Sequence, residues 1–114
     1  MANDKIIGLN EYQKAALETA AYPTEWKIIY PVLGLAGESG EVAEKVKKTI
    51  RDHNGDFDKE RRQAIASEVG DCLWYVAVIA SDLGYTLQEI AEMNYEKLQS
   101  RKNRGKIHGD GDNR

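Results

Sequence analysis

The chain has 114 residues, a length that suits one domain, and 41% of them are hydrophobic and 31% charged, which excludes a disordered chain. No uninterrupted apolar run approaches the ~20 residues that span a bilayer, and the formal net charge of -3 disfavours a nucleic-acid polymer as partner. A single cysteine rules out an internal disulfide, and the N-terminal residues lack the layout of a secretory signal, so a cytoplasmic protein without a membrane partner is expected.

A first helix is predicted from about Asn10 to Tyr22, where Pro23 ends it. Asn10 and Gln13 fit the capping-box pattern. Gln13 also falls in the middle of the apolar face, which allows two interpretations: a core glutamine bonded to backbone, which the spacing favours slightly, or an amide that faces a nucleobase edge. The connector after Pro23 carries Trp26, a second candidate for contact with a base.

A second helix is predicted from Pro31 to about Asp52. Glu38 and Glu41 stand three residues apart beside its apolar stripe, so they project from one side of the helix, one turn apart. Lys45 shares this side, seven residues after Glu38 and four after Glu41. Taken alone, Glu41 and Lys45 also fit an ordinary surface ion pair.

A third helix is predicted from near Asp58 to near Gly84, and it is apolar on nearly all sides over residues 69–80. One chain of this size can hardly cover such a helix, so we expect a partner subunit. Glu68 and Asp71 repeat the three-residue spacing at the start of the apolar segment. Carboxylates are costly there unless they are paired or bound to a metal ion.

A fourth helix should open at a capping box formed by Thr86 and Glu89. Its apolar residues are expected to face the core: Leu87, Ala91, Tyr95 and Leu98. A polar stripe runs beside them at spacings of three, four and three residues: Asn94, Lys97, Arg101 and Arg104. The stripe is either a solvated helix face or a clamp for phosphate groups.

The last residues, 105–114, are too rich in glycine for a helix. The simplest expectation is a flexible C-terminal tail. Alternatively the segment folds over a polyphosphate, with glycine N–H groups and Arg114 as donors.

Four carboxylates in two pairs repel one another unless a cation lies among them, and oxygen ligands suit Mg²⁺ or Mn²⁺. The chain shows no nucleophile with an adjacent base and no Glu-x-x-His pair for a di-iron site. Such metal ions neutralise polyphosphate charge and activate water. Together with the basic stripe, the pattern indicates hydrolysis of a phosphoanhydride.

These residues also carry a resemblance to a family. The run 33–45, Leu-Gly-Leu-Ala-Gly-Glu-Ser-Gly-Glu-Val-Ala-Glu-Lys, resembles the first motif of the MazG-like nucleotide pyrophosphohydrolases, and the run 68–75 resembles the second. Asn94-x-x-Lys97 followed by Arg101 also matches, as does the closing Gly-Asp-Gly-Asp-Asn-Arg. The resemblance covers roughly residues 9–114. It implies a single domain over residues 1–114 with the all-α NTP pyrophosphatase fold, a four-helix bundle-like protomer completed by oligomerisation.

The resemblance further implies that a nucleoside triphosphate is cut between its α and β phosphates, with Mg²⁺ as cofactor and Mn²⁺ as a substitute. It implies catalysis and metal binding by Glu38, Glu41, Glu68 and Asp71. It implies sugar and phosphate contacts by Asn94, Lys97 and Arg101, with Lys45, Arg104 and Arg114 as further candidates and Gln13, Trp26 and Tyr75 as candidates for the base. Homodimers or dimers of dimers are expected, with helices of two chains around each site.

Two other functions stay open at this point. One is a phosphoribosyl-ATP pyrophosphohydrolase, which would share the metal site. The other is a non-catalytic helical module that binds a nucleotide or a partner. The second is disfavoured because both acidic pairs and the cations are intact, whereas a decayed site should have lost some of them.

Overall fold

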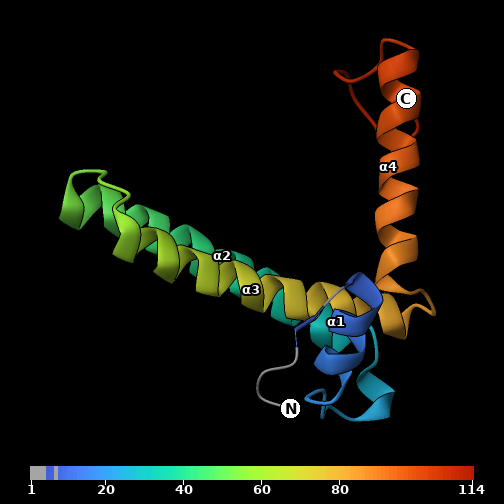
Figure 1. Cartoon of the computed structure of the whole chain (residues 1–114), viewed down its shortest axis with the longest axis horizontal. Coiled ribbons are helices and arrows are strands. Elements are labelled where there is room, and N and C mark those ends of the chain that lie inside the picture. The colour runs from blue at the N-terminus through green and yellow to red at the C-terminus, as the bar shows by residue number, and fades with distance from the viewer. Residues whose placement is uncertain (1–4, 7) are drawn as a thin grey trace.

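The computed structural model describes residues 5, 6 and 8–114, and its regular elements throughout this part of the chain are helices (Figure 1). They are α1 (Leu9–Leu17), the short 3₁₀ turn η1 (Thr24–Trp26), α2 (Ile29–His53), α3 (Lys59–Asp82) and α4 (Leu87–Asn103). The predicted all-α class is confirmed, and α2, α3 and α4 lie within a few residues of their expected bounds.

Two helices begin at the side-chain caps that their sequences provide. At the start of α3, the Asp58 carboxylate accepts a hydrogen bond from the N–H of Arg61 at 2.8 Å. At the start of α4, the Thr86 hydroxyl accepts from the N–H of Glu89 at 3.0 Å, and the Glu89 carboxylate accepts from the N–H of Thr86 at 2.9 Å. The predicted capping box is therefore confirmed at α4.

The capping box predicted at α1 is wrong. The cap of α1 is Gly8, which makes no side-chain cap hydrogen bond. Asn10 and Gln13 instead cap α4. The side-chain oxygen of Asn10 accepts from the N–H of Gln88, and that of Gln13 accepts from the N–H of Leu87, each at 3.0 Å. The first N–H groups of a helix have no partner inside that helix, so α1 satisfies two donors of α4.

The first helix also ends at Leu17, well before the predicted Tyr22. The carbonyl of Ala16 accepts from the Thr19 hydroxyl at 2.9 Å and from the Trp74 indole N–H at 3.1 Å. Side-chain bonds of this kind offer the backbone an alternative to another helical turn. The end of α1 is thus set partly by α3.

The helices form an open arrangement. The two long helices α2 and α3 lie side by side as a hairpin, α1 packs at the end of the hairpin where α3 finishes, and α4 leaves from that end and projects away from it (Figure 1). The small buried core lies where α1, α3 and α4 meet, and it comprises Ala16, Ala77, Val78 and Leu87.

Only the start of α4 belongs to this core. Leu87 is 5% exposed, whereas Tyr95 is 63% and Leu98 is 44% exposed. The prediction that Tyr95 and Leu98 face the core is wrong for the single protomer, because α4 leaves the other helices after its first turns (Figure 1).

The third helix is not buried on all sides within one protomer. Val69 is 50% and Leu73 is 42% exposed. By length and composition alone α3 is long and apolar enough to cross a membrane, although Glu68 and Asp71 interrupt its apolar run. Glu68 and Asp71 would be costly in lipid, and α3 lies against α2. Its exposed apolar side chains therefore favour cover by protein, and the partner subunit stays a prediction.

Candidate active site

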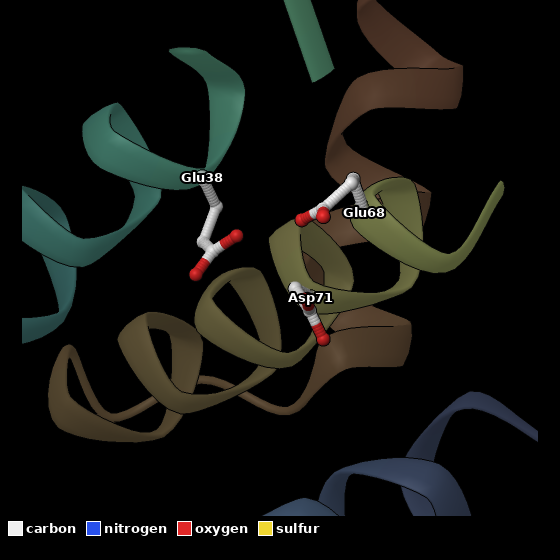
Figure 2. A group of neighbouring side chains, drawn as sticks. All are labelled: Glu38, Glu68 and Asp71. Carbon is white, nitrogen blue, oxygen red and sulfur yellow. The ribbon is translucent and has the colours of Figure 1, made fainter. Parts of the chain in front are cut away.

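Three carboxylates meet where α2 and α3 pack together. Glu38 projects from α2 towards α3, and Glu68 and Asp71 lie one turn apart on α3 (Figure 2). One carboxylate oxygen from each residue lies within 4.8 Å of the others. Glu41, the fourth predicted acid, is exposed and stands outside this group, although its charge acts on Glu38. The two predicted pairs thus converge through three of their four members.

The cluster has the electrostatics of a cation site. Partial burial, together with the negative charges of Asp71 and Glu68, raises the pKa of the Glu38 carboxyl above its ordinary value. A divalent cation among the three groups would remove this repulsion, and carboxylate oxygens are the ligands that hard cations prefer. The donor set therefore fits Mg²⁺ or Mn²⁺.

A recess of about 370 Å³ opens beside the carboxylates, lined by Glu38, Asp71, Trp74 and Tyr75. We call it the acidic recess. Tyr12 of α1 is also near, since burial and then the charge of Asp71 raise the pKa of its phenol. Of the three residues predicted to contact the base, Tyr75 lines the acidic recess and so lies next to the carboxylates.

A second recess, of about 310 Å³, adjoins the first and shares two of its walls, Trp74 and Tyr75. We call it the aromatic recess, and its remaining lining comes from the end of α1 to the start of α2: Thr19, Ala21, Tyr22, Pro23 and Tyr30. The rings of Tyr22 and Tyr30 stack with centroids 5.0 Å apart. The rings of Trp74 and Tyr75 meet edge to face at 4.9 Å.

Sequence reasoning missed Tyr22, Tyr30 and Trp74 as candidates. The position of Trp74, three residues after Asp71 on the same helix, is a signal that could have found it. Tyr22 and Tyr30 carry no such signal, because the connector between α1 and α2 brings them together.

The other two candidates for the base lie elsewhere. Gln13 is 6% exposed, and both its amide nitrogen and its amide oxygen bond to backbone groups. It is the core glutamine that the spacing favoured, and its assignment to the base is corrected. Trp26 is 50% exposed and lines an apolar groove that shares Pro23 and Tyr30 with the aromatic recess, but Trp26 itself lines neither recess.

The predicted phosphate clamp is engaged by the tail. The Lys97 ammonium lies 2.8 Å from a carboxylate oxygen of Asp112, and the Arg101 guanidinium lies 3.1 Å from the same oxygen and also donates to the Asp112 carbonyl. These bonds lower the pKa of Asp112, with Lys97 the larger cause. The side chain of Arg101 is only 8% exposed.

The rest of the tail also follows a defined path back along α4. Arg114 donates to the carbonyls of Lys106, Ile107 and Gly111, and the Arg114 carbonyl accepts from Arg104 at 2.7 Å. The tail thus makes hydrogen bonds along α4, and its flexibility stays a prediction.

The remaining predicted contacts are not brought to the carboxylates. Asn94 is exposed on α4, whose C-terminal half stands away from the hairpin (Figure 1). Lys45 lines a separate recess of about 330 Å³ towards the loop of the hairpin, with Lys48, Asp52 and Arg61 among its neighbours. Within one protomer, the acids and the cations of α4 therefore do not form a joint site.

Comparison with known proteins agrees with the motifs. The model of the MazG nucleotide pyrophosphohydrolase domain matches residues 31–105, which include α3, α4 and all but the first two residues of α2. The Gene 37 protein of Mycobacterium phage L5 is 46% identical over 109 residues, covering 90% of this chain and 96% of that protein. No solved structure matches the chain. With its carboxylate cluster inside the matched segment, the chain belongs to the MazG nucleotide pyrophosphohydrolase domain family.

Proposed function

We propose that the protein is a Mg²⁺-dependent nucleoside triphosphate pyrophosphohydrolase that converts (d)NTP to (d)NMP and pyrophosphate. One observation carries the proposal: three carboxylates from two helices converge beside a recess that shares Trp74 and Tyr75 with a second recess lined by aromatic rings. Such a layout suits a metal-bound polyphosphate at one end and a base at the other.

In the proposal, each acidic residue has a role that follows from its chemistry. Glu38, Glu68 and Asp71 would hold Mg²⁺, with Mn²⁺ as a substitute, and the bound ion would supply charge neutralisation and a more acidic water. Glu41 is exposed and its charge acts on Glu38, which supports a role in orienting the attacking water. In the reaction, water adds across the bond between the α and β phosphates. One product takes the hydroxyl, the bridging oxygen leaves with the other, and a proton is released.

The cations of α4 are assigned to a neighbouring protomer. Because α4 projects away from its own hairpin (Figure 1), the proposal has Lys97 and Arg101 act at the site of a second copy. The proposal therefore includes a homodimer or a dimer of dimers, in keeping with the exposed apolar side chains of α3.

The test is turnover of a panel of (d)NTPs with Mg²⁺, with products resolved by ion exchange. We expect the monophosphate and pyrophosphate in equal amounts. Release of orthophosphate with a diphosphate, or tight nucleotide binding in a calorimeter without any turnover, would reject the proposal.

Substitution of single carboxylates tests which side chains the reaction needs. Glu38→Gln and Asp71→Asn should each lower kcat by at least about 100-fold, since loss of even an outer partner of a metal ligand costs 10- to 100-fold. Their helical circular dichroism should remain that of the wild type. Glu60→Gln, which alters a carboxylate that is 84% exposed on the same helix as Asp71, is the matched control and should retain activity. Unfolding of the first two variants would mean that these acids are structural.

A further inference from the structure

The acidic and aromatic recesses share two lining residues of α3, Trp74 and Tyr75, and Gly34 of α2 faces the second of them. Gly34 lies four residues before Glu38 on α2, and Tyr75 lies four residues after Asp71 on α3. Residues four apart share a helix face, so Gly34 and Tyr75 occupy the layer of the hairpin next to the carboxylates. Tyr75 lines both recesses.

Gly34 leaves the space that the Tyr75 ring fills. A Cβ atom built on Gly34 would lie 2.1 Å from Cε1, 2.4 Å from Cζ and 2.7 Å from Cδ1 of Tyr75. Those separations are far below contact distance, so any side chain at position 34 would force the ring to move. Gly37 and Gly40, on the same helix, have no atom within 4 Å of such a Cβ.

The position of the ring matters because two other aromatic residues that line the recess have their polar atoms bonded within the protein. The Trp74 indole N–H donates to Ala16 and to the Thr19 hydroxyl, and the Tyr22 hydroxyl donates to Asp82 at 2.6 Å. These polar atoms are used within the protein. A ligand would therefore meet Trp74 and Tyr22 through their rings.

We propose that Gly34 is a positioning residue for substrate selection: by carrying no side chain it lets the Tyr75 ring lie against α2 and form the wall between the two recesses. The inference rests on the proposed function. If the phosphates lie at the carboxylates and the base among the rings, the sugar that joins them must pass this wall. Gly34 then fixes the surface that the sugar and base meet, without touching either.

Kinetics of Gly34→Ala test the proposal, with Gly37→Ala as the matched control. Gly34→Ala should raise KM for the nucleotide about tenfold, because misplacement of a contact by about 1 Å can cost up to 10²-fold. Binding of Mn²⁺ alone, measured by electron paramagnetic resonance, should stay within about twofold of wild type because the carboxylates are unaffected. Gly37→Ala should match the wild type in both measurements. Equal behaviour of the two alanine variants, or a parallel loss of Mn²⁺ affinity in Gly34→Ala, would overturn the proposal.

A double-mutant cycle shows whether Tyr75 carries the effect. On a Tyr75→Ala background the ring is gone, so Gly34→Ala should change KM no further, whereas independent effects would add. Should Gly34→Ala alone fail to fold, the double variant should fold, because the overlap is removed. Additive effects on KM, or a double variant that also fails to fold, would contradict the assignment.

A binding measurement separates this inference from the proposed function. In a Trp26→Phe background Trp74 is the only tryptophan, and its fluorescence can be followed while a nucleoside monophosphate is added. The added nucleotide should quench Trp74, and Gly34→Ala should weaken the apparent affinity about tenfold whereas Gly37→Ala should not. Absence of turnover in the wild type would reject the proposed function, and this titration would still decide the role of Gly34.

Discussion

At the scale of single residues, Gln13 joins three parts of the chain. Its amide nitrogen donates to the carbonyls of Ala77 at 3.2 Å and Tyr85 at 3.1 Å, and its amide oxygen accepts from the N–H of Leu87 at 3.0 Å. Each of these backbone groups belongs to α3, to the turn after it or to the start of α4. One side chain of α1 thus fixes where α4 begins relative to α3.

Replacing Gln13 should therefore cost more stability than its size suggests. Gln13→Leu keeps similar volume but leaves the buried N–H of Leu87 without this partner, and an unsatisfied buried group costs about 1–3 kcal/mol. We expect the free energy of unfolding to fall by at least about 2 kcal/mol in urea denaturation. Gln63→Leu, at an exposed position of α3, is the control and should change it little. A small effect of Gln13→Leu would show that water or rearrangement satisfies these groups.

At the scale of elements, the sequence predicts a helix best where the signals lie within that helix. Asp58 and Thr86 cap α3 and α4 as their own segments indicate. The end of α1 escaped prediction because Trp74, far away in the sequence, takes part in setting it. The departure of α4 from the hairpin likewise depends on contacts between helices, so the outward position of Tyr95 had no local signal.

The candidate site, too, was predictable only as far as its signals lie within one helix. Spacing of three residues predicts that Glu38 and Glu41 share a side of α2, but it leaves them about 60° apart around the helix axis. Which of the two meets Glu68 and Asp71 depends on how α2 packs on α3, and the structure selects Glu38. Lys97 and Arg101 were predicted as a stripe, but their shared partner in the tail, Asp112, was not.

The folded-back tail yields a prediction about pH. Bonding to Lys97 and Arg101 lowers the pKa of Asp112 in the folded protein, so its contribution to stability is present above the ordinary pKa of an aspartate and is lost as the pH falls through the lowered value. Asp112→Asn should reduce the free energy of unfolding at pH 7, and the difference from wild type should shrink as the pH falls below the ordinary pKa of an aspartate and vanish below the lowered pKa. Denaturation curves at several pH values measure it. Asp110→Asn is the control, and a difference that persists in acid would contradict the ion pairs.

At the scale of the whole molecule, the apolar surface is large for one protomer. Besides Val69 and Leu73 on α3, it includes aliphatic side chains of α2 that are at least 44% exposed: Ile29, Val32, Leu33 and Ile50. Extensive exposed apolar surface marks an interaction site. With α4 standing away from the hairpin, a second copy is the occupant that would also bring cations to the carboxylates.

A charge placed on this surface should separate the protomers. Val69→Glu would bury an unpaired carboxylate in the proposed interface, at a cost of several kcal/mol. We expect wild type to sediment as a dimer or tetramer at micromolar concentration and Val69→Glu as a monomer with a lower Tm. Lys59→Glu, at the exposed start of α3, is the control for added negative charge. A monomeric wild type with full activity would refute the shared site.

The short connector before α2 has a consequence for how such a protein can evolve. Asp82 accepts from both the Tyr22 hydroxyl and the N–H of Ile28, and Ile28 is held at φ 69, a left-handed conformation that is unusual for a branched residue. The bond from the Tyr22 hydroxyl ties one wall of the aromatic recess to Asp82, the last residue of α3. Tyr22 and Ile28 precede the segment that defines the family, residues 31–105, whereas the carboxylates lie inside it. Under the proposed function, mutation in the connector would therefore change which nucleotides fit while the carboxylates stay unchanged.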